Sequence, residues 1–584
     1  MNHEKELRIK SGDKLLALIK RFSPTEKLLF SLLVIVFIVS ATLLVKGVNE
    51  LFLVSVPTNG GSLTEGVVGL PRLINPVLAF SDTDKDLSAL IYAGLMKNDN
   101  GTIVPDLAQS YTVSSDALTY TFTLKNNLHF QDGSPLTADD ILFTINKIQD
   151  GSLKSPLRAN WANITVKEVA ANQIQFILKQ PYAPFLANTT VGILPKHIWN
   201  NVSTDQFIFS QYNIEPIGAG PYKLATIVRD SGGIPTTYTL TPWTGYPART
   251  AFISQINISF FSDEKSAVEA FNSGLIESIA TISPSDAVDI ASSTKTAHIV
   301  TSPLPRIFGV FFNQNHAPVL ADKTVRQALN MATDRDVVIK EVLGGYGTAI
   351  TSPLPSGFMT ALSTSTTSTA PTADHATNIA AARALLIKNG WALNNKNIFE
   401  KKTKTGTTTL AFSISTPNSP DLTATANILK QQWAAIGASV SIKVFELSDF
   451  NQNVIETRGY DAILFGESIS NGVDLYAFWH SSQRNAPGLN IAMYVNSQTD
   501  KLLEAARAET DIHQQLTDYA AFSNAIQNDV PAVFLYSPDF IYVIPDKLHG
   551  VQIGSVTSPA NRWNGVKDWY TDTENIWKFF IRKQ

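Results

Sequence analysis

The chain of 584 residues contains no cysteine. This absence excludes disulfide bonds, thiolate metal ligands and a cysteine nucleophile. It also excludes the lipid-modified cysteine that attaches many exported proteins to a membrane. If the protein is held at a membrane, an apolar segment of the chain has to hold it there.

Charge of either sign is also scarce. Charged residues make up 16% of the chain, and the net charge is −4. A balance this close to neutral gives no reason to expect a nucleic-acid partner. Apolar residues make up 44%, which is typical of a globular protein. The length exceeds what one hydrophobic core organises, so we expect at least two lobes.

Local signatures of catalysis are missing as well. The sequence has no G-x-S-x-G, H-E-x-x-H or Walker motif, and its nine histidines are scattered without metal-ligand spacing. A Ser/His/Asp triad assembles only in the fold, so the sequence does not decide that case. We predict a protein that is not an enzyme and needs no cofactor or metal.

Three acidic residues imitate the start of a calcium-binding loop. They are Asp82, Asp84 and Asp86. Such a loop needs glycine at its sixth position and glutamate at its twelfth, where this chain has Leu87 and Ala93. We therefore interpret the three acids as the start of a helix, where the positive end of the helix dipole favours them.

A long apolar run lies near the N-terminus. Residues Leu28 to Val45 read LLFSLLVIVFIVSATLLV, about 27 Å of helix, close to the thickness of a bilayer core. Seven basic against four acidic residues precede it, which favours a cytoplasmic N-terminus. We predict a cytoplasmic segment (1–27), a single-pass anchor (28–48), a linker (49–61) and an extracytoplasmic remainder. The alternative is a cleaved signal peptide, because Val39 and Ala41 fit the small-residue cleavage rule.

The stretch from residue 87 to 148 has a well-specified local order. Residues 98–101, Asn-Asp-Asn-Gly, predict a tight turn. Apolar residues alternate with threonine from Leu118 to Leu124, which predicts a strand buried on one face. Thr137, with Asp140 three residues later, predicts the capped start of a helix.

Later segments indicate an α/β fold. Residues 306–313 form a continuous apolar run suited to a buried strand. Residues 410–415, 421–436 and 440–445 predict a strand, a helix and a second strand, which is a βαβ unit. Residues 263–280 have apolar positions at helical spacing and predict a helix broken at Gly274.

The same stretches carry a resemblance to a known family. The sequence reads IYAGLM and then NGTIVPDLAQSYTVSSDALTYTFTLKNNLHFQDGSPLTADDI. Further on it reads PIGAGPYKL and then DKTVRQALNMATDR. This series resembles the family 5 solute-binding proteins of dipeptide and oligopeptide ABC importers, and the resemblance covers about residues 60 to 555.

The resemblance implies a two-lobed α/β fold of the periplasmic-binding-protein type with an inserted subdomain. We place lobe I at residues 62–303 with the subdomain at about 99–215, lobe II at 304–530, and a return to lobe I at 531–584. It also implies a function: the exported part captures peptides and delivers them to the permease and ATPase subunits of an importer. Its members bind their ligand by closing two lobes about a hinge.

Candidate binding residues come from two segments. Residues 460–482 are rich in aromatic and polar side chains at the end of a predicted strand, as a binding cleft requires. In the family, the loop after this strand lines the ligand pocket, and the segment around Tyr92 lends backbone to an extended peptide. The residues carried over are Tyr92, Gly94, Met96, Phe465, Glu467, Ser470 and Trp479.

One position departs from the family pattern. Typical members have a tryptophan and, three residues later, an aspartate that pairs with the ligand's α-ammonium. By an ungapped count these positions are Glu467 and Ser470 here. Since a serine cannot balance a buried ammonium, our hypothesis is that Glu467 takes over. The alternative is that Glu467 faces solvent or pairs with a basic residue.

Other functions fit the same features. The solute could be a sugar or a chelated metal, since relatives bind these. The chain could be a sensor or adhesion receptor that kept the fold and lost transport. An exported hydrolase is a further class, which turnover of a peptide library would reveal.

Overall fold

The computed structural model describes residues 22–99, 101–354, 374–404, 406–469, 474–554 and 556–580. The chain divides into two compact units. The first combines Met1–Thr58 with Asp572–Gln584, and the second is Asn59–Thr571. Each is described below by itself.

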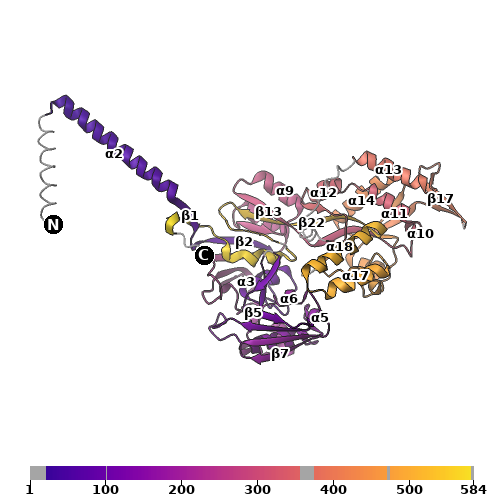
Figure 1. Ribbon diagram of the computed structural model, residues 1–584, viewed down its shortest axis with the longest axis horizontal. Helices are drawn as coiled ribbons and strands as arrows, with labels where there is room; N and C mark the ends of the chain where they lie inside the picture. The colour runs from indigo at the N-terminus through magenta and orange to yellow at the C-terminus, as the bar shows by residue number, and fades with distance from the viewer. Residues whose placement is uncertain are drawn as a thin grey trace. The chain divides into compact units, whose positions relative to one another are not determined.

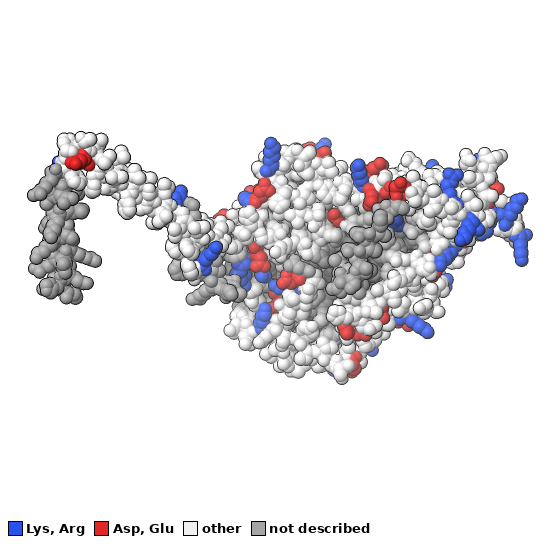
Figure 2. All heavy atoms as spheres, turned by 45° about the horizontal axis from the view of Figure 1, so that its top comes forward, with Lys and Arg blue, Asp and Glu red and all other residues white. Residues whose placement is uncertain are grey.

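The first unit is built on helix α2 (Pro24–Phe52), which contains the predicted anchor. Ser23 caps it: the Ser23 hydroxyl accepts from the Glu26 backbone N–H at 3.4 Å, and the Ser23 backbone N–H donates to the Glu26 carboxylate at 2.7 Å. The helix is long and apolar enough to cross a membrane. Its apolar side chains are exposed, and Figure 2 shows an uncharged surface between charged residues near its two ends.

Two strands complete this unit. Strand β1 (Leu53–Pro57), within the segment predicted as a linker, pairs antiparallel with β23 (Thr573–Trp577) near the C-terminus. The ring of Phe52 stacks on Trp577 and on Phe579, with centroids 5.9 and 5.6 Å apart. The end of the apolar helix is therefore tied to the C-terminal strand.

The second unit is organised around a twelve-stranded sheet of order β20-β19-β21-β14-β22-β12-β2-β11-β10-β9, with β13 and β15 also paired to β22 (Figure 1). Its strands are β2 (Gly60–Val68), β9 (Tyr222–Arg229), β10 (Pro235–Pro242), β11 (Ile253–Phe261), β12 (Ser278–Ala280), β13 (Ala297–Pro303), β14 (Arg306–Phe312), β15 (Gly347–Ala349), β19 (Ala411–Pro417), β20 (Ser439–Phe445), β21 (Ala462–Ser468) and β22 (Ala532–Pro545).

Strand β22 divides this sheet into two lobes. Its first half pairs with β14 and packs into the cores of residues 307–536. Its second half pairs with β13 and packs into the cores of residues 63–304. We call residues 59–304 and 538–571 lobe I, and residues 305–537 lobe II. The chain crosses between the lobes at 304–306 and 537–539.

Lobe I carries the inserted subdomain, a four-stranded antiparallel sheet of order β5-β6-β8-β7. Its strands are β5 (Ala108–Val113), β6 (Thr119–Leu124), β7 (Ile164–Ala170) and β8 (Gln173–Leu178). Every second residue of β6 is buried, which confirms the alternation read from the sequence. Hairpin β3 (Met96–Asp99) and β4 (Thr102–Pro105) confirms the predicted turn.

Capping residues start two helices of lobe I, and the cap at Thr137 was predicted from the sequence. Ser81 caps α3 (Asp82–Ile91), where Asp84 accepts hydrogen bonds from the backbone of Arg72 and Leu73. The Thr137 backbone N–H donates to Asp140 at 2.9 Å, at the start of α4 (Ala138–Gln149). The other helices of this lobe are α5 (Arg158–Trp161), α6 (Phe185–Asn188), α7 (Lys196–Trp199), α8 (Glu264–Asn272) and α9 (Pro284–Ser293).

Lobe II contains the predicted βαβ unit. Strands β19 and β20 are parallel, and α14 (Pro420–Ala435) connects them. Its other helices and strands are α10 (Pro318–Ala321), α11 (Lys323–Met331), α12 (Arg335–Leu343), α13 (His375–Lys388), α15 (Leu447–Asp449), α16 (Tyr476–Trp479), α17 (Ser497–Ala508), α18 (Ile512–Asp529), β16 (Ala392–Leu393), β17 (Phe399–Thr403) and β18 (Gly406–Thr409).

The prediction for residues 263–280 was partly wrong. Helix α8 ends at Asn272, and Gly274 has φ +76°, a left-handed conformation that stops a helix. Residues Ser278–Ala280 instead form β12, which pairs with β2 and β22. These partners lie more than 200 residues away in the sequence, so periodicity within the segment could not reveal them.

Candidate ligand-binding site

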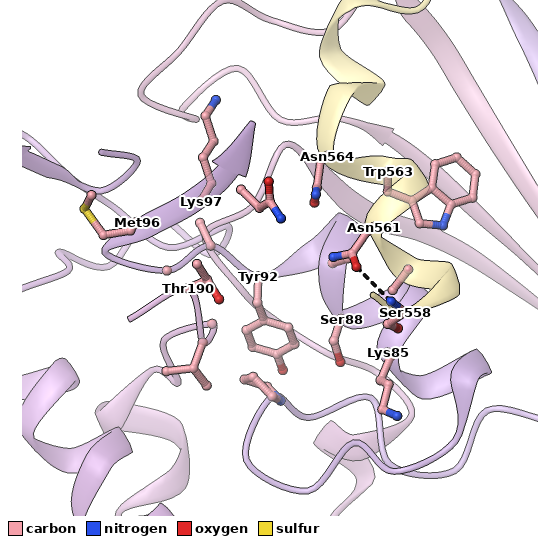
Figure 3. Close-up of a pocket in the computed structure, with 18 of the residues that line it drawn as sticks. Lys85, Ser88, Tyr92, Met96, Lys97, Thr190, Ser558, Asn561, Trp563 and Asn564 are labelled. Atoms are coloured by element: carbon pink, nitrogen blue, oxygen red, sulfur yellow. Dashed lines mark hydrogen bonds between the residues drawn. The ribbon is translucent and has the colours of Figure 1, made fainter. Parts of the chain in front are cut away.

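Two cavities lie where lobe I meets lobe II. The first, cavity A, has a volume of about 500 Å³. Its walls come from α3, β3 and the 3-10 helix η5 (Pro559–Asp568), all in lobe I. Residues within 157–161 and 187–192 of lobe I and Ser468, from the end of β21 in lobe II, also line it. Figure 3 shows this cavity with α3 and η5 on adjoining sides.

One face of α3 supplies polar groups to cavity A. Lys85, Ser88 and Tyr92 follow at spacings of three and four residues, which places them on one side of the helix. The hydroxyls of Ser88 and Tyr92 are buried and have no hydrogen-bond partner in the part of the chain that the structure describes. Burial raises the pKa of Tyr92, so its phenol stays protonated and can donate.

The facing wall is η5. The side-chain oxygen of Asn561 accepts hydrogen bonds from the backbone of Thr557 and Ser558, each at 2.9 Å. This leaves its amide nitrogen directed away from Ser558, as Figure 3 shows. Asn564 follows three residues later and also lines the cavity. Residues three apart eclipse one another in a 3-10 helix, so both amides belong to one face.

Gly94 and Met96 also line cavity A, through tightly packed backbone. A Cβ at Gly94 would lie 2.6 Å from the carbonyl oxygen of Thr190, so only glycine fits there. The Gly94 carbonyl accepts from the Leu107 N–H, and the Met96 N–H donates to the Thr189 carbonyl. These two groups are thus satisfied within the protein, whereas the family resemblance implies backbone available to a peptide.

The second cavity, cavity B, has a volume of about 490 Å³ and lies beside the crossings between the lobes. Its lining is mostly apolar and includes Phe465 of β21. Three acids also line it: Asp421, Glu467 and Asp539. Burial raises the pKa of each of them, and one oxygen of Asp539 is buried without a partner in the described structure. Arg306 lines the same cavity, so the lining contains three acids and one basic residue.

Glu467 is 3% exposed and lies on β21 opposite Ile307 of β14. Neither carboxylate oxygen has a hydrogen-bond partner of good geometry among the described residues. Burial raises its pKa well above the ordinary value, and the indole of Trp479 opposes the shift. Glu467 neither faces solvent nor pairs with a basic residue in the structure as described. A cation near it would remove a large desolvation cost.

Trp479 lies in the core of lobe II rather than in the lining of either cavity. It is the last residue of α16 and packs against aromatic rings, including Phe534 at a centroid distance of 5.8 Å. Asp474 accepts a hydrogen bond from the Tyr476 N–H at the start of this helix. Ser470 lies outside the described residues.

Several lining residues escaped the sequence reading. Lys85 and Ser88 could have been found, because they precede Tyr92 at helical spacing on the same predicted helix. Lys97 follows Met96 in the recognised motif. Asn561 had no signal, because η5 carries no motif and reaches α3 from more than 450 residues further along the chain.

Comparisons with known proteins show the family of the chain. The family model of bacterial extracellular solute-binding proteins, family 5, middle region, matches residues 102–487. Oligopeptide-binding protein AppA of Bacillus subtilis is 27% identical over 504 residues, covering 85% of this chain and 89% of that protein.

Solved structures of substrate-binding proteins share the fold of this chain. The ABC transporter substrate-binding protein CtaP of Listeria monocytogenes superposes with a TM-score of 0.71 and 26% identity, covering 88% of this chain and all of that one. AppA of Bacillus subtilis in complex with a nonapeptide superposes with a TM-score of 0.61 and 25% identity, covering 88% and 99%. Because the family model spans more than half of the sequence, and the two-lobed fold agrees, this chain belongs to the family 5 bacterial extracellular solute-binding proteins.

Proposed function

We propose that the chain captures peptides outside the cytoplasm and delivers them to the permease and ATPase of an ABC importer. The observation that carries this proposal is the pair of cavities between the lobes: three lysines and one acid line cavity A, and three acids and one arginine line cavity B. A peptide carries both charges, so it can satisfy both cavities. The match to an oligopeptide-binding protein supports the same ligand class.

The residues that we propose to contact the peptide follow from these cavities. Tyr92 and the backbone around Gly94 and Met96 form one wall, and Phe465 and Glu467 form another. Trp479 would act indirectly, through its indole beside the Glu467 carboxyl. Ser470 stays a prediction from the sequence alone. Binding would draw the lobes together about the crossings at 304–306 and 537–539.

Ligand capture has a direct test. Full-length protein, freed of ligand, should melt at a higher temperature when a peptide pool is added, because the peptide binds the folded state only. Small-angle scattering should show compaction under the same conditions. No change in either quantity with any peptide pool would favour the sensor or adhesion class.

Contacts across the lobes suggest what holds the closed state. The guanidinium of Arg507 in lobe II lies over the rings of Tyr182, 5.6 Å away in lobe I, and Tyr476, 4.7 Å away in lobe II. Asp474 pairs with Arg507 at 3.1 Å. The Arg507 carbonyl accepts from the backbone N–H of Ala183 in lobe I.

Removing the Arg507 side chain should weaken the contact that holds lobe I against lobe II. Arg507→Met is expected to lower peptide affinity about two- to fivefold, the range that a cation–π contact contributes. The radius of gyration of the ligand-free protein should rise. Arg484→Met is the matched control, because the Arg484 side chain donates to the Ser481 carbonyl of its own lobe. Equal peptide affinity and an equal radius of gyration for both variants would contradict a role of Arg507 in holding the lobes together.

We also propose that α2 remains attached as an anchor. Its apolar side chains are exposed along the span, a surface that water does not tolerate and a bilayer does. The hydroxyl of Thr42 donates to the Ile38 carbonyl, so this polar group is satisfied inside the helix. The N-terminus would be cytoplasmic and the second unit extracytoplasmic.

The anchor proposal predicts the behaviour of the full-length protein in cells. It should remain in the membrane fraction after a carbonate wash, with its original N-terminus. Replacing Val34 and Phe37 with aspartate should release it, because each charge costs about 2.5–3.5 kcal/mol in a membrane helix. Recovery of a soluble species that begins near Thr42 would show a cleaved signal peptide instead.

A further inference from the structure

We propose that the end of α2 and the C-terminal strand form a second membrane contact, in which the rings of Phe52, Trp577 and Phe579 lie in the interfacial layer of the bilayer. The partner is the lipid surface itself. This inference rests on the proposed anchor, because α2 has to span the bilayer for its end to reach that layer. It goes beyond the anchor, since it assigns a membrane contact to the C-terminal part of the chain.

The length of α2 places Phe52 at the level of the lipid headgroups. The helix has 29 residues, which corresponds to about 43 Å at about 1.5 Å per residue. A bilayer is about 40–45 Å thick when its headgroup regions are included. A helix that begins at one face of the membrane therefore ends at the other. Strand β1 continues directly from the last residue of α2 (Figure 1).

Three aromatic side chains meet at the end of α2. The planes of Phe52 and Trp577 are inclined by 13°, and those of Phe52 and Phe579 by 30°. The cluster is not covered by protein in the described structure, because Trp577 is 40% exposed and Phe579 is 75% exposed. Tryptophan is enriched where a membrane meets water, with its ring at the level of the headgroups. A lipid interface would cover the aromatic surface that the protein leaves open.

The ribbon of β1 and β23 changes in polarity along its length. At the α2 end, Leu53 lies opposite Trp577, and Val54 lies opposite Ile576. Residues directly opposite in an antiparallel pair share a face, so both faces are apolar at this end. Further along β23, residues 573–575 are threonine, glutamate and asparagine, and all three are exposed. This change from apolar to polar follows the change from hydrocarbon to water across a membrane interface.

The ribbon gains from such a contact. It has two strands, and an isolated two-stranded ribbon is marginally stable at best in water. Lipid at its apolar end would add the buried surface that two strands lack. The exposed Lys578 stands between the two exposed rings in the sequence. A lysine at this level can keep its stem among apolar groups and extend its ammonium toward the headgroups.

Tryptophan fluorescence in brominated liposomes tests the contact, because bromine on a lipid quenches a tryptophan that touches it. The chain has nine tryptophans. Eight are buried, whereas Trp577 is 40% exposed and is the one tryptophan in the first unit. Full-length protein is reconstituted into liposomes of phosphatidylcholine and phosphatidylglycerol. Their acyl chains carry bromine near the headgroup end, near the methyl end, or not at all.

Bromine near the headgroups should remove the share of emission that one of the nine tryptophans contributes. The variant Trp577→Phe should lose none. Two further variants in this Trp577→Phe background move the probe. Glu574→Trp, on the exposed polar part of β23, should not be quenched. Phe37→Trp, in α2, should be quenched by bromine near the methyl end and reports on the anchor by itself.

The outcomes separate the interfacial contact from the anchor. Quenching of the wild type that disappears in Trp577→Phe supports the inference. An unquenched wild type beside a quenched Phe37→Trp overturns it and leaves the anchor standing, with the rings free to contact a protein such as the permease. Equal quenching of Glu574→Trp and the wild type overturns the assignment to the apolar end. An unquenched Phe37→Trp overturns the anchor and this inference together.

Discussion

Replacing Arg562 with methionine is expected to destabilise the protein by about 3–5 kcal/mol, the cost of stranding buried charge. Arg562 is 1% exposed and forms two ion pairs. It meets Asp86 of α3 with two hydrogen bonds of 2.7 Å and Glu65 of β2 with one of 2.8 Å. Methionine fills the volume but would leave both carboxylates without a cation.

The Arg562–Asp86 ion pair also holds together two walls of cavity A. Arg562 belongs to η5, and Asp86 to α3, so the ion pair joins the two helices that line cavity A. The Tyr542 hydroxyl of β22 also donates to Glu65, which links this cluster to the strand that runs through both lobes. Loss of Arg562 should therefore loosen cavity A as well as lower stability.

Urea unfolding of the full chain measures the effect. Arg562→Met combined with Glu65→Gln and Asp86→Asn should recover most of the lost stability, because no buried charge then remains. Arg249→Met is the control: its partner Asp568 is half-exposed, and the expected loss is about 1 kcal/mol or less. A triple variant no more stable than Arg562→Met would contradict the charge explanation and leave lost packing as the cause.

The stability loss caused by Arg562→Met should also depend on pH. Burial raises the pKa of Asp86 to about 6, against the lowering effect of Arg562. A raised pKa means that the folded state holds the proton more tightly, so this contribution to stability is present in acid and is lost as the pH rises through about 6. The deficit of Arg562→Met should accordingly be smaller near pH 5 than near pH 8.

Glu467→Gln is expected to stabilise the ligand-free protein at neutral pH by about 1–3 kcal/mol, because glutamine needs neither ionisation nor proton uptake in the buried site. The pKa of Glu467 is raised well above its ordinary value by burial. Its favourable contribution is therefore complete below the ordinary pKa and is lost as the pH rises through the raised one. The gain from Glu467→Gln should vanish at acidic pH, and exposed Glu456→Gln should show neither effect.

Ligand affinity should change in the opposite sense. If Glu467 receives the α-ammonium of a peptide, Glu467→Gln should weaken binding of free-amine peptides by about 1.5–3 kcal/mol. N-acetylated peptides should bind the variant and the wild type alike. Isothermal titration with both peptide forms measures the difference. Equal affinity of the wild type for free and acetylated peptides would refute the role of Glu467.

Features set by neighbours in the sequence were predictable. The alternation around Tyr120 and Phe122 fixes which face of β6 is buried, because a strand has a period of two. Caps such as Thr137 with Asp140 act over one helical turn. The family resemblance added the two lobes, and the solved structures of relatives confirm that fold.

Features set by distant pairing were not predictable in this way. Strand β12 exists because β2 and β22 flank it, and nothing within residues 278–280 requires a strand. Glutamate is usually exposed, so the burial of Glu467 opposite Ile307 could not be read from its neighbours. Cavity A combines α3 with η5 from the far end of the chain, and only the fold brings Lys85 and Asn561 to one space.

Native mass spectrometry of the purified full-length protein tests the central claim most directly. A receptor that captures peptides should carry a heterogeneous set of co-purified peptides, released on activation and identifiable by their fragment ions. After these are removed, an added peptide pool should restore the bound species. Release of a sugar or a chelated metal instead, or protein that stays empty with the peptide pool present in excess, would contradict peptide capture.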